Sequence, residues 1–141
     1  MVTETALALG DGRALLVYDT GTGHGTTGLA VFWQRGTPST GAPPEPLFVA
    51  VAERGIRWVS HDRPGYGGST PHPGRNVASA AADVASIADA LGIGRFAVMG
   101  DSGGGPHALA CAAVLPERVL ATVCMLRLPR SAPRAWTGSR E

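Results

Sequence analysis

Residues 100–104 read Gly-Asp-Ser-Gly-Gly, and this stretch decides the fold because it fits G-x-S-x-G between a strand-like and a helix-like segment. The short apolar run at residues 95–99 is typical of a strand buried on both faces of a parallel sheet. After the stretch, Pro106 occupies a position where a first helical turn tolerates proline, and residues 108–115 favour a helix. The pattern therefore predicts a sharp strand-to-helix turn that presents Ser102 as a nucleophile.

The same turn provides a hydrogen-bond donor beside the serine. The backbone N–H of Gly103 follows the nucleophile at the N-terminus of a helix, where it can stabilise a developing oxyanion. Ser102 and Gly103 therefore form the centre of the predicted catalytic site. The alternative is a glycine-rich turn with a serine that only caps the helix.

Two other interpretations of glycine-rich stretches fit their context poorly. Residues 100–104 also resemble the active-site string of trypsin-like proteases, but those proteins are all-β and this serine opens an alanine-rich helix. Residues 23–28 match G-x-G-x-x-G, yet they precede a strand at 29–33, whereas a dinucleotide-binding fingerprint follows a strand and opens a helix. We expect residues 23–28 to form a flexible connection.

The rest of the chain alternates between strand and helix patterns. Asp-Gly at residues 11–12, between apolar runs at 6–9 and 14–19, predicts a hairpin. Further strands are predicted at 29–33, 56–60, 95–99 and 119–126, and helices at 43–54, 76–91 and 108–115. This alternation predicts an α/β fold with a mostly parallel sheet flanked by helices.

The helix predicted at residues 76–91 carries the clearest signals. Asn76 is a favourable N-cap residue and Gly92 a favourable stop. The apolar residues expected on one stripe are Val77, Ala81, Val84, Ile87 or Ala88, and Leu91.

Three motifs together resemble the α/β hydrolase fold family, in its order and spacing, over residues 6–125: the turn at 100–104, Arg-Gly-Thr-Pro at 35–38, and the loop at 62–69. The resemblance implies that Thr37 supplies the second oxyanion N–H. The family usually has histidine where Arg35 stands, so the side chain that braces this loop differs. The alternative to an oxyanion role is a turn that only connects the strand to the helix. We expect the loop at 62–69 to be a rigid support near the cleft without a chemical role.

A serine nucleophile indicates ester, thioester or amide substrates and an acyl-enzyme intermediate. Epoxide hydrolases and haloalkane dehalogenases of this fold use an aspartate at that position. The resemblance therefore implies a serine hydrolase that acts on ester-type small molecules.

The family's triad runs from serine to an acid to a histidine along the chain, and this order is not completed here. After Ser102 the only acids are Glu117 and Glu141, and the only histidine is His107, which falls inside the helix that the serine opens. We expect His107 to be a packed side chain that does not reach the hydroxyl. The other three histidines precede the serine: His24, His61 and His72. The sequence therefore predicts a catalytically incomplete site.

The composition changes after the last predicted strand. We expect residues 1–126 to form a partial hydrolase domain and residues 127–141, with four arginines and no apolar period, to form an irregular tail. The tail also fits out-of-frame translation of a GC-rich gene, which would make this chain the truncated start of a longer hydrolase. A non-catalytic binding or scaffold protein and one half of a split hydrolase are the alternatives. The exposed last strand predicts self-association.

Charge and cysteine content limit the partners. A net charge of +1 without a basic cluster before the tail gives no indication of nucleic acid or an anionic membrane as partner, and no signal peptide is indicated. Cys111 and Cys124 lack a metal-ligand spacing and are expected to be free thiols in the cytoplasm. No metal or organic cofactor is predicted, and the expected partner is a small ester-type substrate.

Overall fold

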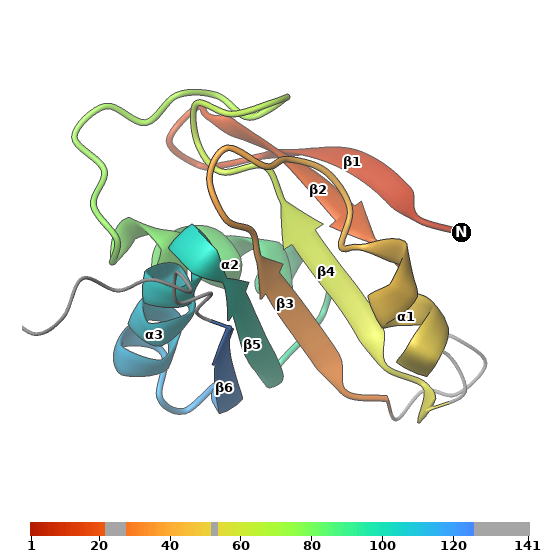
Figure 1. The fold of residues 1–141 in the computed structure, drawn as a ribbon. Helices are drawn as coiled ribbons and strands as arrows, with labels where there is room; N and C mark the ends of the chain where they lie inside the picture. Colours follow the sequence, from red (N-terminus) through yellow and green to blue (C-terminus); the bar gives the residue numbers. More distant parts are fainter. Residues whose placement is uncertain (22–27, 52–53, 126–141) are drawn as a thin grey trace, which may run out of the picture.

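The computed structural model describes residues 1–21, 28–51 and 54–125, with only the backbone described at 48, 50 and 51. Six strands form one sheet in the order β1-β2-β4-β3-β5-β6 (Figure 1). The strands are β1 (Thr3–Ala8), β2 (Ala14–Asp19), β3 (Ala30–Gln34), β4 (Arg57–His61), β5 (Phe96–Asp101) and β6 (Val119–Met125). The helices are α1 (Glu45–Val51), α2 (Ser79–Ala90) and α3 (Gly105–Val114), and a single 3₁₀ turn, η2 (Ser102–Gly104), precedes α3.

The sheet is mixed, with a parallel part of four strands. β4, β3, β5 and β6 run parallel, while the β1–β2 hairpin joins β4 in the antiparallel direction. The predicted α/β class and mostly parallel sheet are therefore confirmed. Because the carboxyl ends of parallel strands meet at one edge, the segments that follow β3, β4 and β5 come together there.

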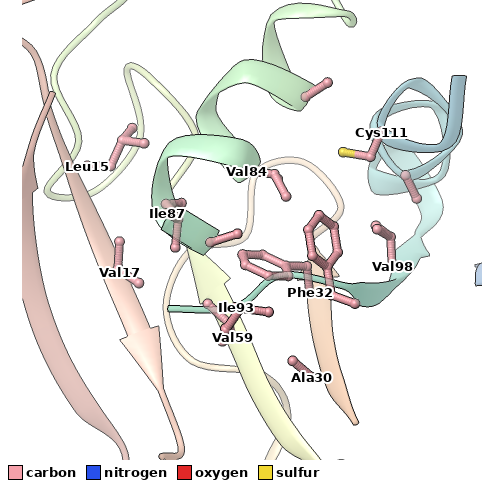
Figure 2. Packing of buried hydrophobic residues seen from close by; sticks show 14 residues of the cluster. Leu15, Val17, Ala30, Phe32, Val59, Val84, Ile87, Ile93, Val98 and Cys111 are labelled. Atoms are coloured by element: carbon pink, nitrogen blue, oxygen red, sulfur yellow. The ribbon is translucent and has the colours of Figure 1, made fainter. Parts of the chain in front are cut away.

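The larger core lies between the sheet and helices α2 and α3, as Figure 2 shows. Val84 and Ile87 of α2 are wholly buried against the strands, and the rings of Phe32 and Phe96 lie 4.7 Å apart at 55°. Burying one such side chain contributes about 1.5–3 kcal/mol, so this layer is the main source of stability.

The opposite face carries α1 and a smaller cluster built on Val31, Trp33 and Trp58. An open apolar groove of about 420 Å³ extends from this cluster and α1 over β5 and β6, with Leu47, Met99 and Val123 among its lining residues. The two faces of the sheet are therefore unequally covered by the described helices.

The second helix differs from its prediction at the N-terminus. It begins at Ser79, after a turn at residues 76–79 in which Oδ1 of Asn76 accepts a hydrogen bond from the Ser79 N–H at 3.1 Å. Val77 consequently lies before the helix and is 43% exposed, so its place on the apolar stripe was wrong. Ala81, Val84, Ile87 and Ala88 are buried as expected, and Gly92, at φ 67°, ends the helix.

Several boundaries shift by a few residues. β1 begins at Thr3, earlier than predicted, because all six residues of β2 have a partner on it. β3 runs from Ala30 to Gln34, which leaves Leu29 outside the strand. α1 begins after the two prolines at 43–44 and is shorter than predicted. Residues 22–27, most of the predicted connection, and 126–141 lie outside the described residues, so the division near residue 126 stays a prediction.

Candidate active site

Ser102 occupies the turn between β5 and α3. Its φ of 49° makes it the single non-glycine residue with positive φ in the described part of the chain. This left-handed conformation is costly for a residue with a β-carbon and is concentrated at functional sites. Ser102 is exposed to solvent, so the strained turn holds a hydroxyl clear of the sheet. The strand, the turn and the helix thus occur where the glycine pattern predicted them.

Close backbone packing explains the glycines of this turn. A β-carbon at Gly104 would collide with the backbone carbonyl of Gln34, and one at Gly100 would collide with the carbonyl of Gly104. The turn therefore lies directly on the end of β3, and its shape depends on residues without side chains.

The loop after β3 lies against the same turn. A β-carbon built on Gly36 would lie 3.2 Å from Cβ of Ser102, and one built on Gly103 would lie 3.4 Å from the backbone nitrogen of Thr37. Ser102, Gly103 and Thr37 are thus brought together, as the sequence predicted. Two backbone N–H groups from separate loops beside a serine hydroxyl can act together on a carbonyl oxygen, and these roles remain predictions.

Arg35 braces this loop in place of the histidine usual in the family. Its Nε donates a hydrogen bond to the carbonyl oxygen of Gly41 at 3.0 Å, and its Nη2 donates to the carbonyl of Ala42. The loop is therefore still supported by a side chain, although the residue type differs.

Asp62 pins the loop at residues 62–69 to its surroundings. Its buried carboxylate accepts hydrogen bonds from the N–H groups of Gly41 at 2.8 Å and Gly68 at 3.0 Å, and from the Tyr18 hydroxyl at 3.3 Å. A β-carbon at Gly67 would also collide with this carboxylate. These contacts fit the supporting role predicted for the loop.

The neighbouring Arg63 makes a contact that the sequence analysis did not predict. Its Nη2 donates a hydrogen bond to Oγ1 of Thr37 at 2.8 Å, and its guanidinium lies 5.2 Å from the centre of the Tyr66 ring. Arg63 is 5% exposed, and burial lowers the pKa of its guanidinium. The sequence signal that could have drawn attention to Arg63 is a positively charged residue inside the glycine-rich loop at residues 62–69.

None of the described histidines is hydrogen-bonded to Ser102. Nδ1 of His107 donates to the carbonyl oxygen of Gly103 at 3.0 Å, which fixes the ring against its own helix, and burial lowers the pKa of the imidazole. His61 is fully buried on β4, and burial lowers its pKa from 6.5 to about 4. His72 lies in a loop, and His24 lies outside the described residues.

The remaining candidate groups are also separated from the turn or undescribed. Glu117 is exposed beyond the C-terminal end of α3, and Glu141 lies outside the described residues. Within the described ranges, the Ser102 hydroxyl therefore lacks an acid–histidine pair. In the same ranges, no cluster of three or more side chains suits a metal ion.

Both cysteines are free thiols, as predicted, and burial raises the pKa of Cys111 to about 12. None of the helices in the described ranges combines the length and apolar character needed to cross a membrane.

Comparisons with known proteins agree with this architecture. A profile of the α/β hydrolase fold matches residues 24–137. A 2-hydroxy-6-oxononadienedioate/2-hydroxy-6-oxononatrienedioate hydrolase from Burkholderia vietnamiensis is 36% identical over 118 residues, which cover 82% of this chain and 41% of that protein. The chain thus spans less than half the length of this curated relative.

Solved structures share the fold at lower sequence identity. The thioesterase domain from the curacin biosynthetic pathway superposes with a TM-score of 0.74 at 21% identity, covering 94% of this chain and 49% of that one. A predicted CIB-like hydrolase from Thermoplasma acidophilum superposes with a TM-score of 0.73 at 18% identity, covering 88% and 62%. The sheet, the strand-to-helix turn and the profile match together establish that the chain belongs to the α/β hydrolase family.

Proposed function

We propose that this chain carries the nucleophile of a serine hydrolase that acts on ester-type small molecules, namely carboxylic esters, thioesters or amides. The observation that carries the proposal is the left-handed Ser102, with the backbone N–H groups of Gly103 and Thr37 beside it. The Burkholderia relative and the curacin thioesterase domain are both named for hydrolytic reactions, which supports a hydrolase of small molecules. A serine at the turn favours acyl transfer over chemistry that depends on an aspartate nucleophile.

In the proposed reaction, Oγ of Ser102 bonds to the carbonyl carbon while its proton passes to a general base. The carbonyl oxygen becomes an oxyanion that accepts hydrogen bonds from the N–H groups of Gly103 and Thr37. The intermediate then expels the alcohol, thiol or amine, which takes up the proton, and leaves an acyl-enzyme. Water releases the acid and restores the serine hydroxyl.

We further propose that the base and its acid partner come from outside the described residues. His107 is fixed on Gly103 and His61 is buried in the core, so neither fits the role of a base next to Ser102. Losing the base costs a serine hydrolase about 10⁶-fold in turnover by analogy with subtilisin, so we expect the described residues alone to be catalytically incomplete. Free Cys111 and Cys124 support a reducing, cytoplasmic location for this chemistry.

A fluorophosphonate probe tests the nucleophile, because it forms a stable covalent adduct with an activated serine. We expect intact-mass analysis after prolonged incubation to find one adduct, located at Ser102 by peptide mapping and absent from Ser102→Ala. Ser86→Ala is the matched control, because Ser86 is exposed on α2 and donates only to the Ala82 carbonyl within its helix. An adduct that persists in Ser102→Ala would contradict the assignment.

A second candidate function is suggested because no base is hydrogen-bonded to Ser102 among the described residues. A binding or scaffold protein, or one half of a split hydrolase, would keep the turn and the oxyanion loop without its own acid–histidine pair. Translating the coding DNA beyond the codon of Met125 in all frames, and the adjacent reading frames, separates these cases. A continuation with further strands, an acid and a late histidine supports the hydrolase, whereas its absence from every frame favours the binding protein.

A further inference from the structure

Arg63 is a buried cation without an anionic partner. It is 5% exposed, yet in the described part of the chain it forms no ion pair with a carboxylate. By contrast, Arg13 pairs with Asp83 at 2.9 Å and Arg57 pairs with Asp19 at 2.6 Å. Buried charges are ordinarily paired, because removing an ion from water is costly. An unpaired buried guanidinium beside a candidate active site therefore points to an anion that arrives from outside.

The hydrogen bonds of Arg63 leave part of its guanidinium available. Nη2 donates to Oγ1 of Thr37, a neutral acceptor, and Nε is buried with no hydrogen-bond partner. The adjacent Asp62 forms no ion pair with it, and the hydrogen bonds to that carboxylate come from Gly41, Gly68 and Tyr18. Arg63 thus has no ion-pair partner among the described residues and keeps an unused donor.

Two further basic side chains, Arg75 and His107, lie near Arg63. Burial lowers the pKa of His107, and the charges of Arg63 and Arg75 lower it further. The three basic groups therefore lie near one another. Arg75 also lowers the pKa of Arg63, while the other charge effect on Arg63 comes from Tyr66. Because Arg63 itself has no ion-pair partner among the described residues, these additional basic groups favour an anion over a neutral group beside it.

This neighbourhood adjoins the predicted oxyanion donors. Thr37, which accepts the hydrogen bond from Arg63, lies next to Gly103, and His107 is bonded to the Gly103 carbonyl. An anion held by Arg63 would therefore lie close to an acyl group attached to Ser102.

We propose that Arg63 forms an anion-binding subsite beside the oxyanion loop, which holds a carboxylate carried by the ester substrate. The proposal rests on the proposed function and deepens it, because it selects acidic esters over neutral ones. Arg63 recognises the carboxylate through its unused donor and its charge, and Arg75 and His107 strengthen the field at that point. Recognition of this kind orients the scissile carbonyl toward Ser102.

The test compares two esters that differ in one charge, monomethyl succinate and dimethyl succinate. Both are titrated into the isotopically labelled full chain, and binding is followed by NMR at the amide signals of Thr37 and Gly103, so no turnover is needed. We expect the charged ester to bind about tenfold more tightly, which corresponds to about 1.4 kcal/mol, and this preference to weaken as ionic strength rises. Acetate and inorganic phosphate, titrated separately, show whether a free anion suffices; the proposal expects both to bind more weakly than monomethyl succinate.

Three variants make the test specific to Arg63. Arg63→Gln should remove the preference for the charged ester, whereas Arg63→Lys should keep most of it. Arg95→Gln is the matched control, because Arg95 is exposed and precedes β5 at the opposite end of the strand. If Arg63→Gln fails to fold, the salt dependence and the Arg63→Lys result on folded protein still decide the matter.

Equal binding of the two esters to the wild-type chain would overturn the proposal, as would a preference that survives Arg63→Gln or tighter binding of free phosphate or acetate. These results are independent of probe labelling at Ser102. A labelled serine without charge preference contradicts only the anion subsite, whereas charge preference without a labelled serine contradicts only the proposed hydrolase activity.

Discussion

The turn at Ser102 and the β6 edge are both parts of one parallel sheet, but they differ in how completely they are packed. At the turn, three loops contact one another through backbone approaches and hydrogen bonds that involve Gly104, Asp62 and Arg63. At the other region, β6 ends the strand order, and Leu120 and Val123 are 47% and 48% exposed. The turn that carries Ser102 is thus well supported, while the sheet edge formed by the described strands remains open.

This difference shows that the turn is packed chiefly by the neighbouring loops. The contacts around Ser102 come from segments that follow β3, β4 and β5, all within the described residues. The groove that extends over β5 and β6 is apolar, and among the described helices only α1 reaches it, through Leu47. A parallel sheet usually has both faces covered, so this is the region where a further segment or partner would add most.

The largest expected effect comes from Gly104→Ala, which tests the packing of the turn. The new β-carbon would collide with the backbone carbonyl of Gln34, so we expect the free energy of unfolding to fall by about 3 kcal/mol or more. Urea unfolding measures the loss. Gly94→Ala is the matched control, because a β-carbon there meets nothing within 4 Å, and equal effects of both substitutions would contradict the packing described.

The next effect concerns Asp62, which joins the loops around the turn. Asp62→Asn removes a buried charge that accepts three hydrogen bonds, and we expect a loss of about 2 kcal/mol in urea unfolding. The control, Asp89→Asn, affects an ion pair with Arg118 in which the aspartate side chain is 70% exposed, and should cost no more than about 0.5 kcal/mol. A smaller loss from Asp62→Asn than from Asp89→Asn would show that the loop is not held in this way.

His61 predicts a loss of stability in acid. Its pKa is lowered from 6.5 to about 4, chiefly by burial. The positive charges of Arg63 and His107 lower the pKa further, whereas the carboxylates of Asp83 and Asp62 raise it. The unfolded chain therefore binds this proton first, and the stabilisation disappears as pH falls from about 6.5 towards 4. Because of this group, the free energy of unfolding should fall by roughly 2 kcal/mol between pH 7 and pH 5.

Urea unfolding of the wild type and His61→Asn at both pH values measures this contribution. The difference in unfolding free energy between pH 7 and pH 5 should shrink in the variant. An unchanged difference would mean that His61 is accessible to protons in the folded state.

The smallest effect on stability, within about 0.5 kcal/mol, is expected for Val123→Lys at the open edge. Because β6 has no charged residue, two copies can pair edge to edge without repulsion, and we expect the wild type to self-associate. A lysine on the edge should reduce the average mass in light scattering. Val114→Lys on α3, where the valine is 53% exposed, serves as control, and a wild-type monomer would exclude this pairing.

The sequence predicted those parts of the site that depend on local backbone geometry. The glycines at 100–104 predicted the turn, and Gly92 predicted the end of α2, because each is a local conformational requirement. The contact of Arg63 with Thr37 was not predictable in this way, because it joins residues 26 positions apart and depends on how two loops meet. The start of α2 was misplaced because residues 76–79 form a turn, closed by reciprocal hydrogen bonds between Asn76 and Ser79, that leads directly into the helix.

We proposed that Ser102 is a nucleophile without a base among the described residues, and the rate of fluorophosphonate labelling as a function of imidazole concentration would test this proposal. Oxyanion donors and binding alone sustain about 10³–10⁴-fold catalysis over water, so we expect slow labelling of Ser102 without imidazole. Imidazole, acting as an external base, should accelerate this labelling, with no adduct in Ser102→Ala. A Ser102 that stays unlabelled with and without imidazole would contradict the account.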